Sequence, residues 1–174
     1  MALQLGHRRS VDFDWFTDQA LGDPLRLVRQ FQEDGVAVRV DGTARGTLHA
    51  RVSGVRVSFL EYRYPLLEDP LRLPGLSTAL ASISDIACMK LSAITQRGAR
   101  KDFVDLHAIG RSLPLAEMMR LYRKKFGVRD IGHVLTALTY FDDADRERAL
   151  QMLQRTDWPT VKATLRGWVK GLAG

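Results

Sequence analysis

The chain has 174 residues, of which 45% are hydrophobic and 26% are charged, which suits one ordinary globular domain or a small domain with a helical extension. Its single cysteine, Cys88, excludes an intrachain disulfide, and no apolar run reaches the roughly 20 residues of a membrane-spanning helix, so we expect no membrane and a cytoplasmic location. The formal net charge of +6 favours polyanionic partners such as nucleotides or RNA, and the scattered histidines argue against a zinc site.

The first predicted element is a strand over residues 11–16, which contains Asp12 and Asp14 two positions apart. Alternate side chains of a strand point to the same side, so the carboxylates share one face while Val11, Phe13 and Trp15 pack on the other. Two converging carboxylates suit Mg²⁺ or Mn²⁺, which take oxygen ligands and accept the rest from water and substrate phosphates. The spacing therefore predicts a metal site. The alternative is a pair of solvated aspartates that pair with the preceding arginines.

A basic segment with the sequence Gly6-His7-Arg8-Arg9-Ser10 leads into this strand. Such a glycine-containing, cationic approach could hold the anion that the metal neutralises. We therefore predict that Arg8 and Ser10 help to hold phosphate.

The next part of the chain predicts one helix and three strands. Asp23-Pro24 begins an amphipathic helix, because apolar residues recur at three-residue spacing after it. Turns are predicted at Asp41-Gly42 and Ser53-Gly54, and prolines make residues 64–75 a connecting loop. Runs of β-branched and aromatic residues predict consecutive antiparallel strands at residues 36–40, 47–52 and 55–62.

A second group of charged residues lies on two predicted helices that are separated at Gly98. Ser82 or Ser84 caps the first helix, which carries Lys90 and Arg97 seven residues apart and therefore nearly in line. Without a further motif, Lys90 is simply a surface lysine beside an apolar stripe. Arg97 and Lys101 have a structural alternative, which is to pair with Asp102 and Asp105 and so dock one helix on the next.

From Pro114 onward the sequence predicts further helices, whose apolar stripes we expect to form a core. Trp158 and Trp168 are expected to pack there, although aromatic rings also stack on bases. A basic group could follow an RNA backbone or simply form a solvated helix end; its members are Arg120, Arg123, Lys124, Lys125 and Arg129.

Two motifs in combination carry a family resemblance. The first is Gly6-His7-Arg8-x-Ser10-x-Asp12-x-Asp14, and the second runs from Met89-Lys90-Leu91 through Arg97-Gly98 to Lys101-Asp102-Phe103-Val104-Asp105. Together they resemble the AbiEii/AbiGii family of nucleotidyltransferase-like toxins, over nearly all of the chain. The resemblance implies an α+β fold of the DNA polymerase β-like nucleotidyltransferase type: a small mixed β-sheet packed with helices, followed by a C-terminal helical bundle. We place the β-rich core at residues 1–75 and the helical part at residues 76–174.

The resemblance also implies an activity, which is metal-dependent transfer of a nucleotide from an NTP to an acceptor hydroxyl of RNA or tRNA. Asp12 and Asp14 would bind the metal, and Lys90 with Arg97 would steady the triphosphate, for which an ammonium is a suitable compact charge. Asp105 would orient or deprotonate the hydroxyl, or form a structural pair. The implied setting is a toxin–antitoxin or phage-defence system, with a separately encoded antitoxin as partner.

Two departures from the family keep an alternative open. Members usually carry a Gly-Gly or Gly-Ser pair at the start of a helix whose end looks like residues 1–6, and this sequence begins inside that helix. A third carboxylate, commonly on a neighbouring strand, is represented only by Glu61, for which pairing with Arg63 is the simpler role; Asp102 or Asp105 could replace it. The alternative is a shortened, catalytically inactive module that binds RNA, nucleotide or protein.

Overall fold

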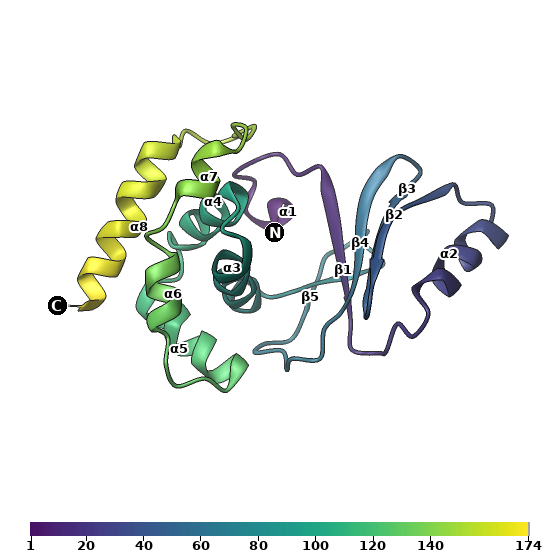
Figure 1. Cartoon of the computed structure of the whole chain (residues 1–174), viewed down its shortest axis with the longest axis horizontal. Coiled ribbons are helices and arrows are strands. Elements are labelled where there is room, and N and C mark those ends of the chain that lie inside the picture. Colours follow the sequence, from purple (N-terminus) through teal and green to yellow (C-terminus); the bar gives the residue numbers. More distant parts are fainter. Residues whose placement is uncertain (174) are drawn as a thin grey trace. The chain divides into compact units, whose positions relative to one another are not determined.

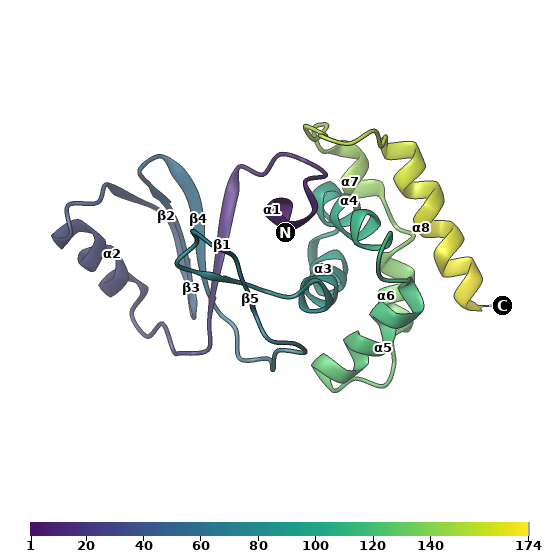
Figure 2. The ribbon, with the colours of Figure 1, turned by 180° about the vertical axis from the view of Figure 1, so that it is seen from behind.

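The computed structural model describes residues 1–173 and divides the chain into two compact units (Figures 1 and 2). The sheet unit is Ser10–Tyr64, and the helical unit joins Met1–Arg9 to the chain from Pro65 onward. This division differs from the one drawn at residue 75. Residues 1–9 pack with the helices because His7 and Arg8 bind Asp105, and Pro65 belongs there because its carbonyl accepts a hydrogen bond from Lys125.

The sheet unit holds a four-stranded mixed sheet and one helix. The strand order is β1-β4-β3-β2; β1 runs parallel to β4, and the other neighbours are antiparallel. Together with the helices of the rest of the chain, this sheet confirms the α+β class. The elements are β1 (Asp12–Thr17), α2 (Pro24–Glu33), β2 (Val38–Ala44), β3 (Thr47–Val52) and β4 (Val55–Glu61).

Helix α2 covers one face of this sheet, as Figure 1 shows. Asp23 caps the helix by accepting from the Leu25 backbone N–H at 3.0 Å, with proline in the first turn as the sequence predicts. Val28 of α2 forms a small core with Leu48 and Ala50 of β3. The apolar face of the sheet is therefore the one that carries Leu48 and Ala50, and alternation places Asp12 and Asp14 on the opposite face.

The apolar side of β1 is less buried than expected. Phe13 and Trp15 contact each other with ring centroids 5.7 Å apart, and Trp15 stacks on Phe59 at 5.9 Å. Even so, Phe13 is 48% exposed and Trp15 41% exposed, and Val11 lies outside β1. β1 is an edge strand, so its rings have packing neighbours on one side only.

One predicted turn is wrong. Strand β2 continues through Asp41-Gly42, where the register shifts at a bulge, and the hairpin closes at Arg45-Gly46 instead. Gly46 has φ +69°, and a Cβ there would meet Glu61 Cβ at 3.0 Å, so this is the position that requires glycine. The second turn is confirmed: Ser53 and Gly54 both have positive φ, as a tight two-residue hairpin requires.

The helical unit is built around α3, with α4 and α6 beside it in both ribbon views (Figures 1 and 2). Ser82 caps α3, and Gly98 ends it in the left-handed conformation. No helix among the described residues combines the length and apolarity needed to cross a bilayer. The elements are α1 (Ala2–Leu5), β5 (Leu71–Arg72), β6 (Ala79–Leu80), α3 (Ile83–Arg97), α4 (Arg100–Ile109), α5 (Leu115–Phe126), α6 (Gly132–Ala137), α7 (Asp142–Arg146) and α8 (Trp158–Ala173).

The core of this unit is apolar and includes Cys88, Leu91 and Phe103. Cys88 is fully buried, and burial raises the pKa of its thiol to about 12, so it packs as a small hydrophobic group. Trp158 contacts Phe103 at 6.0 Å between ring centroids, which confirms its packing role.

A buried ion pair joins α5 to α3 inside this core. Lys125 Nζ donates to Asp85 Oδ1 at 2.6 Å and to the Pro65 carbonyl at 2.7 Å, and both charged side chains are fully buried. Lys125 therefore does not belong to the exposed basic group predicted around α5. Burial alone would raise the pKa of Asp85, but hydrogen bonds from Lys125, Ser82 and the Leu67 backbone lower it below its usual range.

We expect Lys125→Met to destabilise the protein by about 3–5 kcal/mol, because it leaves the Asp85 carboxylate buried without its cation. Urea unfolding at neutral pH measures the loss. Lys124→Met is the matched control, since Lys124 is the exposed neighbour on the same helix. Equal stability of the two variants would contradict the structural role of the pair.

Candidate functional site

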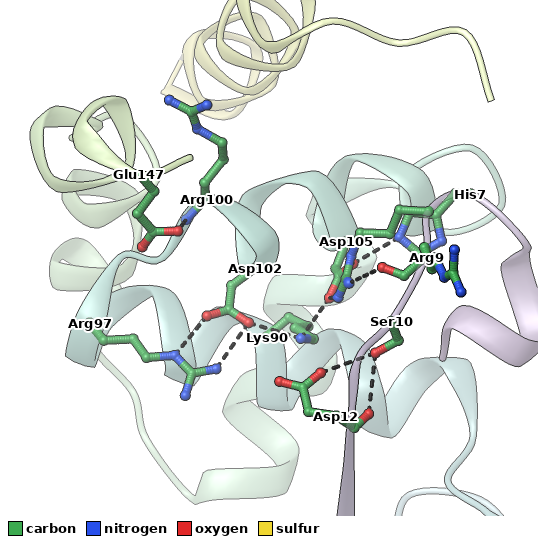
Figure 3. A network of polar contacts seen from close by, with 11 residues as sticks. His7, Arg9, Ser10, Asp12, Lys90, Arg97, Arg100, Asp102, Asp105 and Glu147 are labelled. Carbon is green, nitrogen blue, oxygen red and sulfur yellow. Dashed lines mark hydrogen bonds and ion pairs between the residues drawn. The ribbon is translucent and has the colours of Figure 1, made fainter. Parts of the chain in front are cut away.

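The Asp105 carboxylate is the centre of a cationic cluster in the helical unit. α4 carries Asp105 fully buried, and the guanidinium of Arg8 binds it in a bidentate manner, Nε to Oδ1 at 2.6 Å and Nη2 to Oδ2 at 2.9 Å. His7 Nε2 lies 2.8 Å from Oδ1 and must donate, since an ionised carboxylate only accepts. Lys90 Nζ lies 2.7 Å from Oδ2 (Figure 3).

These donors set the protonation of Asp105. Burial alone would raise the pKa of its carboxyl, but hydrogen bonds from His7 and Arg8 and the charge of Lys90 hold the pKa well below its usual range. A carboxylate so stabilised is a weak base. Of the two roles predicted for Asp105, the geometry favours the structural one, in which it positions Lys90 and Arg8.

Lys90 is held between two carboxylates. Its Nζ donates to Asp102 Oδ1 at 2.8 Å and approaches Asp105 Oδ2, and its side chain is 19% exposed. Burial alone would lower the pKa of Lys90, but Asp105 and Asp102 raise it, so the ammonium stays charged. An ammonium has three N–H donors. The two carboxylates use two of them, which leaves one N–H donor.

Arg97 lies at the end of α3 and forms a salt bridge to the start of α4. Its Nε and Nη2 donate to the two oxygens of buried Asp102 at 2.8 and 3.2 Å (Figure 3). The predicted structural pairing of Arg97 with Asp102 is therefore present. The Arg97 side chain nevertheless remains 55% exposed, so its guanidinium is also accessible to an anion from solvent.

The sheet unit carries the other predicted residues. Asp12 and Asp14 lie on β1 opposite Arg56 and Ser58 of β4, on one face of the sheet, and Asp14 is exposed. Ser10 Oγ donates to Asp12 Oδ1 at 3.1 Å and to the Asp12 carbonyl at 3.2 Å. Ser10 thereby fixes the turn into β1 and orients the first carboxylate.

The donor chemistry of Asp12 and Asp14 fits a hard cation. They supply carboxylate oxygens, which Mg²⁺ prefers. Within residues 1–173 no group of three or more His, Cys, Asp or Glu side chains is placed to hold a metal, so these two aspartates would be the only such ligands from the described residues. Glu61 is committed elsewhere, because it pairs with Arg63 at 2.6 Å as the sequence predicts. A cation here would take its remaining ligands from water and substrate, which Mg²⁺ readily does.

The predicted site residues thus fall into two sets. Arg8, Lys90, Arg97 and Asp105 lie together in the helical unit, whereas Asp12, Asp14 and Ser10 lie together in the sheet unit. The chain passes from one unit to the other between Arg9 and Ser10. The roles assigned to these residues in metal and phosphate binding stay predictions.

His7 is the residue that sequence reasoning left out of the site. Its side chain is 2% exposed and binds Asp105 across 98 positions of sequence. Its position directly before Arg8 in the first motif could have marked it as a site residue. Nothing in that motif, however, indicates a buried partner on a distant helix.

Comparisons with known proteins identify a family and a relative. The family model for the nucleotidyl transferase AbiEii toxin of type IV toxin–antitoxin systems matches residues 1–167. The chain is also similar to an uncharacterized protein of Aquifex aeolicus (strain VF5), aq_aa25, with 39% identity over 150 residues that cover 84% of this chain and 72% of that protein. The family match thus defines a nucleotidyltransferase-type protein. This chain belongs to the AbiEii toxin family, which confirms the resemblance and implies an antitoxin partner.

Replacing the central carboxylate tests its structural role. We expect Asp105→Asn to lower the free energy of unfolding by about 3–5 kcal/mol, because Arg8 and Lys90 then lose the buried negative charge that both contact. Thermal and urea unfolding measure this. Asp143→Asn on exposed α7 is the control and should leave stability nearly unchanged; a similar small effect at both positions would contradict the structural role.

The lowered pKa of Asp105 also predicts a pH dependence. A carboxyl with a depressed folded pKa contributes stability above its unfolded pKa, about 3.9, and loses it as the pH falls towards the folded value. The free energy of unfolding should therefore drop below about pH 4, by up to about 1.4 kcal/mol per pH unit for this group. The difference in free energy of unfolding between wild type and Asp105→Asn should become smaller as the pH falls. A constant difference down to pH 2 would contradict the lowered pKa of Asp105.

Proposed function

We propose that this protein is a Mg²⁺- or Mn²⁺-dependent nucleotidyltransferase that transfers a nucleotide from an NTP to an acceptor hydroxyl on RNA, with tRNA as the favoured class. The observation that carries this proposal is the placement of Asp12 and Asp14 on one face of edge strand β1, with Asp14 exposed. Membership of the AbiEii toxin family supports nucleotidyl transfer in general.

In this proposal Asp12 and Asp14 hold the cation, and Ser10 keeps Asp12 oriented. The cation, when bound, would neutralise the phosphates and polarise the α-phosphoryl group. Lys90 presents its remaining N–H donor to the triphosphate, and exposed Arg97 adds a second positive charge. Arg8 serves the site indirectly, by fixing Asp105 and with it Lys90.

The reaction is a single displacement at phosphorus. The acceptor oxygen forms a bond to the α-phosphorus, the bond from that phosphorus to the bridging oxygen breaks, and pyrophosphate leaves with the electron pair. Lys90 and Arg97 offset the charge that develops on pyrophosphate. The hydroxyl proton passes to water, since Asp105 is too weak a base to accept it.

The biological setting follows from the family as a proposal. The protein would act in the cytoplasm as the toxin of a toxin–antitoxin pair, with a role in phage defence, and a cognate antitoxin would silence it.

A second candidate function is a non-catalytic module that binds RNA, nucleotide or a protein partner. The observation that favours it is the engagement of Arg8, Lys90 and Arg97 with the carboxylates of Asp102 and Asp105. Such pairing would also be present if the cluster served only to join α3 and α4. Equilibrium binding of NTP separates the two candidates, since the enzyme requires Mg²⁺-dependent binding that Asp14→Asn abolishes.

The direct test is transfer of label from each α-labelled NTP into total RNA in the presence of Mg²⁺. We expect Asp12→Asn to reduce incorporation by at least about 100-fold, because loss of a metal ligand removes several kcal/mol of charge stabilisation. Asp18→Asn is the control, an exposed aspartate of the same unit. Undiminished transfer by Asp12→Asn would overturn the metal assignment, and no transfer by the wild type would favour the binding module.

A further inference from the structure

Three arginines form a row across the sheet face that carries the two aspartates. Arg39 of β2 lies opposite Arg51 of β3, Arg51 lies opposite Arg56 of β4, and Arg56 lies beside Asp12 of β1. We propose that this arginine row binds the phosphodiester backbone of a single-stranded RNA. That the RNA is the acceptor rests on the proposed function; that the row binds RNA does not.

The register fixes which face the row occupies. Residues directly opposite each other in a sheet point to the same side, so Arg39, Arg51 and Arg56 share the face of Asp12. The other face carries Ala50, which packs under α2. Within the sheet unit, the arginine row therefore lies on the face away from its own helix.

The row is accessible and only partly neutralised. The Arg39 side chain is 71% exposed, the Arg51 side chain is 38% exposed, and Arg56 is exposed. Asp41, at the bulge of β2, pairs with Arg39 and with Arg51 at 3.2 Å each. Among residues 1–173 no carboxylate forms an ion pair with Arg56.

Energetics favour an anionic ligand for such a row. Like charges directly opposite each other destabilise a sheet, and here Arg51 has an arginine on both sides. Asp41 offsets this repulsion only in part. Phosphate oxygens match the fork of a guanidinium and would offset the remaining charge while forming bidentate hydrogen bonds.

The length of the row favours a nucleic-acid strand over a nucleoside triphosphate. Neighbouring strands lie about 4.8 Å apart, so Arg39 is roughly 14 Å from the Asp12 position. A ligand that contacts the outer arginine and also reaches Asp12 must carry phosphates over that whole distance. A nucleic-acid strand does so, whereas a single triphosphate does not.

Exposed rings at the other end of β1 favour an unpaired strand. Phe16 is 43% exposed and contacts Tyr62 edge-on at 5.4 Å, and Tyr62 contacts Tyr64, which is 52% exposed. Phe16 lies two and four positions from the aspartates and so points to their side of the sheet. Aromatic rings and cationic groups on one surface are the features that bind single strands, by stacking and by phosphate contact.

The test is fluorescence anisotropy with an end-labelled single-stranded RNA of about 12 nucleotides, without NTP or Mg²⁺. Arg39→Gln/Arg56→Gln removes two charges from the row, and Arg26→Gln/Arg29→Gln removes two exposed charges from α2. Each phosphate contact contributes about 0.7 to the salt slope, so the row variant should lose about 1.4 in slope and bind about 25-fold more weakly at 0.1 M salt. The α2 variant should bind like the wild type.

Equal weakening by both variants would overturn the proposal, since it would show dependence on net charge alone. Unchanged RNA binding with weakened ATP binding in the row variant would also overturn it and assign the row to the triphosphate. Arg56→Lys, which keeps the charge, should retain most of the affinity and guards against a folding defect. If the wild type transfers no label yet binds RNA through the row, the proposed function fails and the RNA site stands.

Discussion

The bidentate contact between Arg8 and Asp105 is the interaction on which the rest of the arrangement depends. It ties the segment just before β1 to helix α4, and the same carboxylate holds Lys90 of α3. Two consecutive helices and a segment far from them in sequence therefore meet at one buried anion. Because Arg8 and Lys90 both contact this anion, its removal costs more than the loss of either contact alone.

Ion pairs join helix α3 to its neighbours near both of its ends. Near its start Asp85 binds Lys125 of α5, and towards its end Lys90 and Arg97 bind Asp102 of α4. Buried ion pairs add little net stability over apolar packing, but they fix one geometry because each partner is costly without the other. The pairs with Asp102 therefore hold Lys90 and Arg97 in place before any ligand binds.

The sequence predicted those parts of the fold that local patterns determine. The strand predicted over residues 11–16 followed from alternation and is found as Asp12–Thr17, and the helix that ends at Gly98 followed from its cap and stop signals. Local sequence patterns did not predict the contacts between distant residues. Nothing local shows that Lys125 is buried against Asp85, or that His7 meets Asp105. The Asp41-Gly42 turn was misplaced because a bulge can absorb that pair inside a strand.

In the proposed enzyme, Asp12 and Asp14 would hold the cation without a third carboxylate. Arg56 and Ser58 of β4 lie beside Asp12 and Asp14, and neither residue is a carboxylate. A cation held by two carboxylates keeps more of its coordination positions for water and phosphate than one held by three. In the proposed enzyme, metal affinity would therefore depend strongly on the nucleotide that completes the shell, and Arg56 beside Asp12 would oppose binding of the cation alone. Metal and NTP would then bind as a unit, and the site would hold no metal until the nucleotide is present.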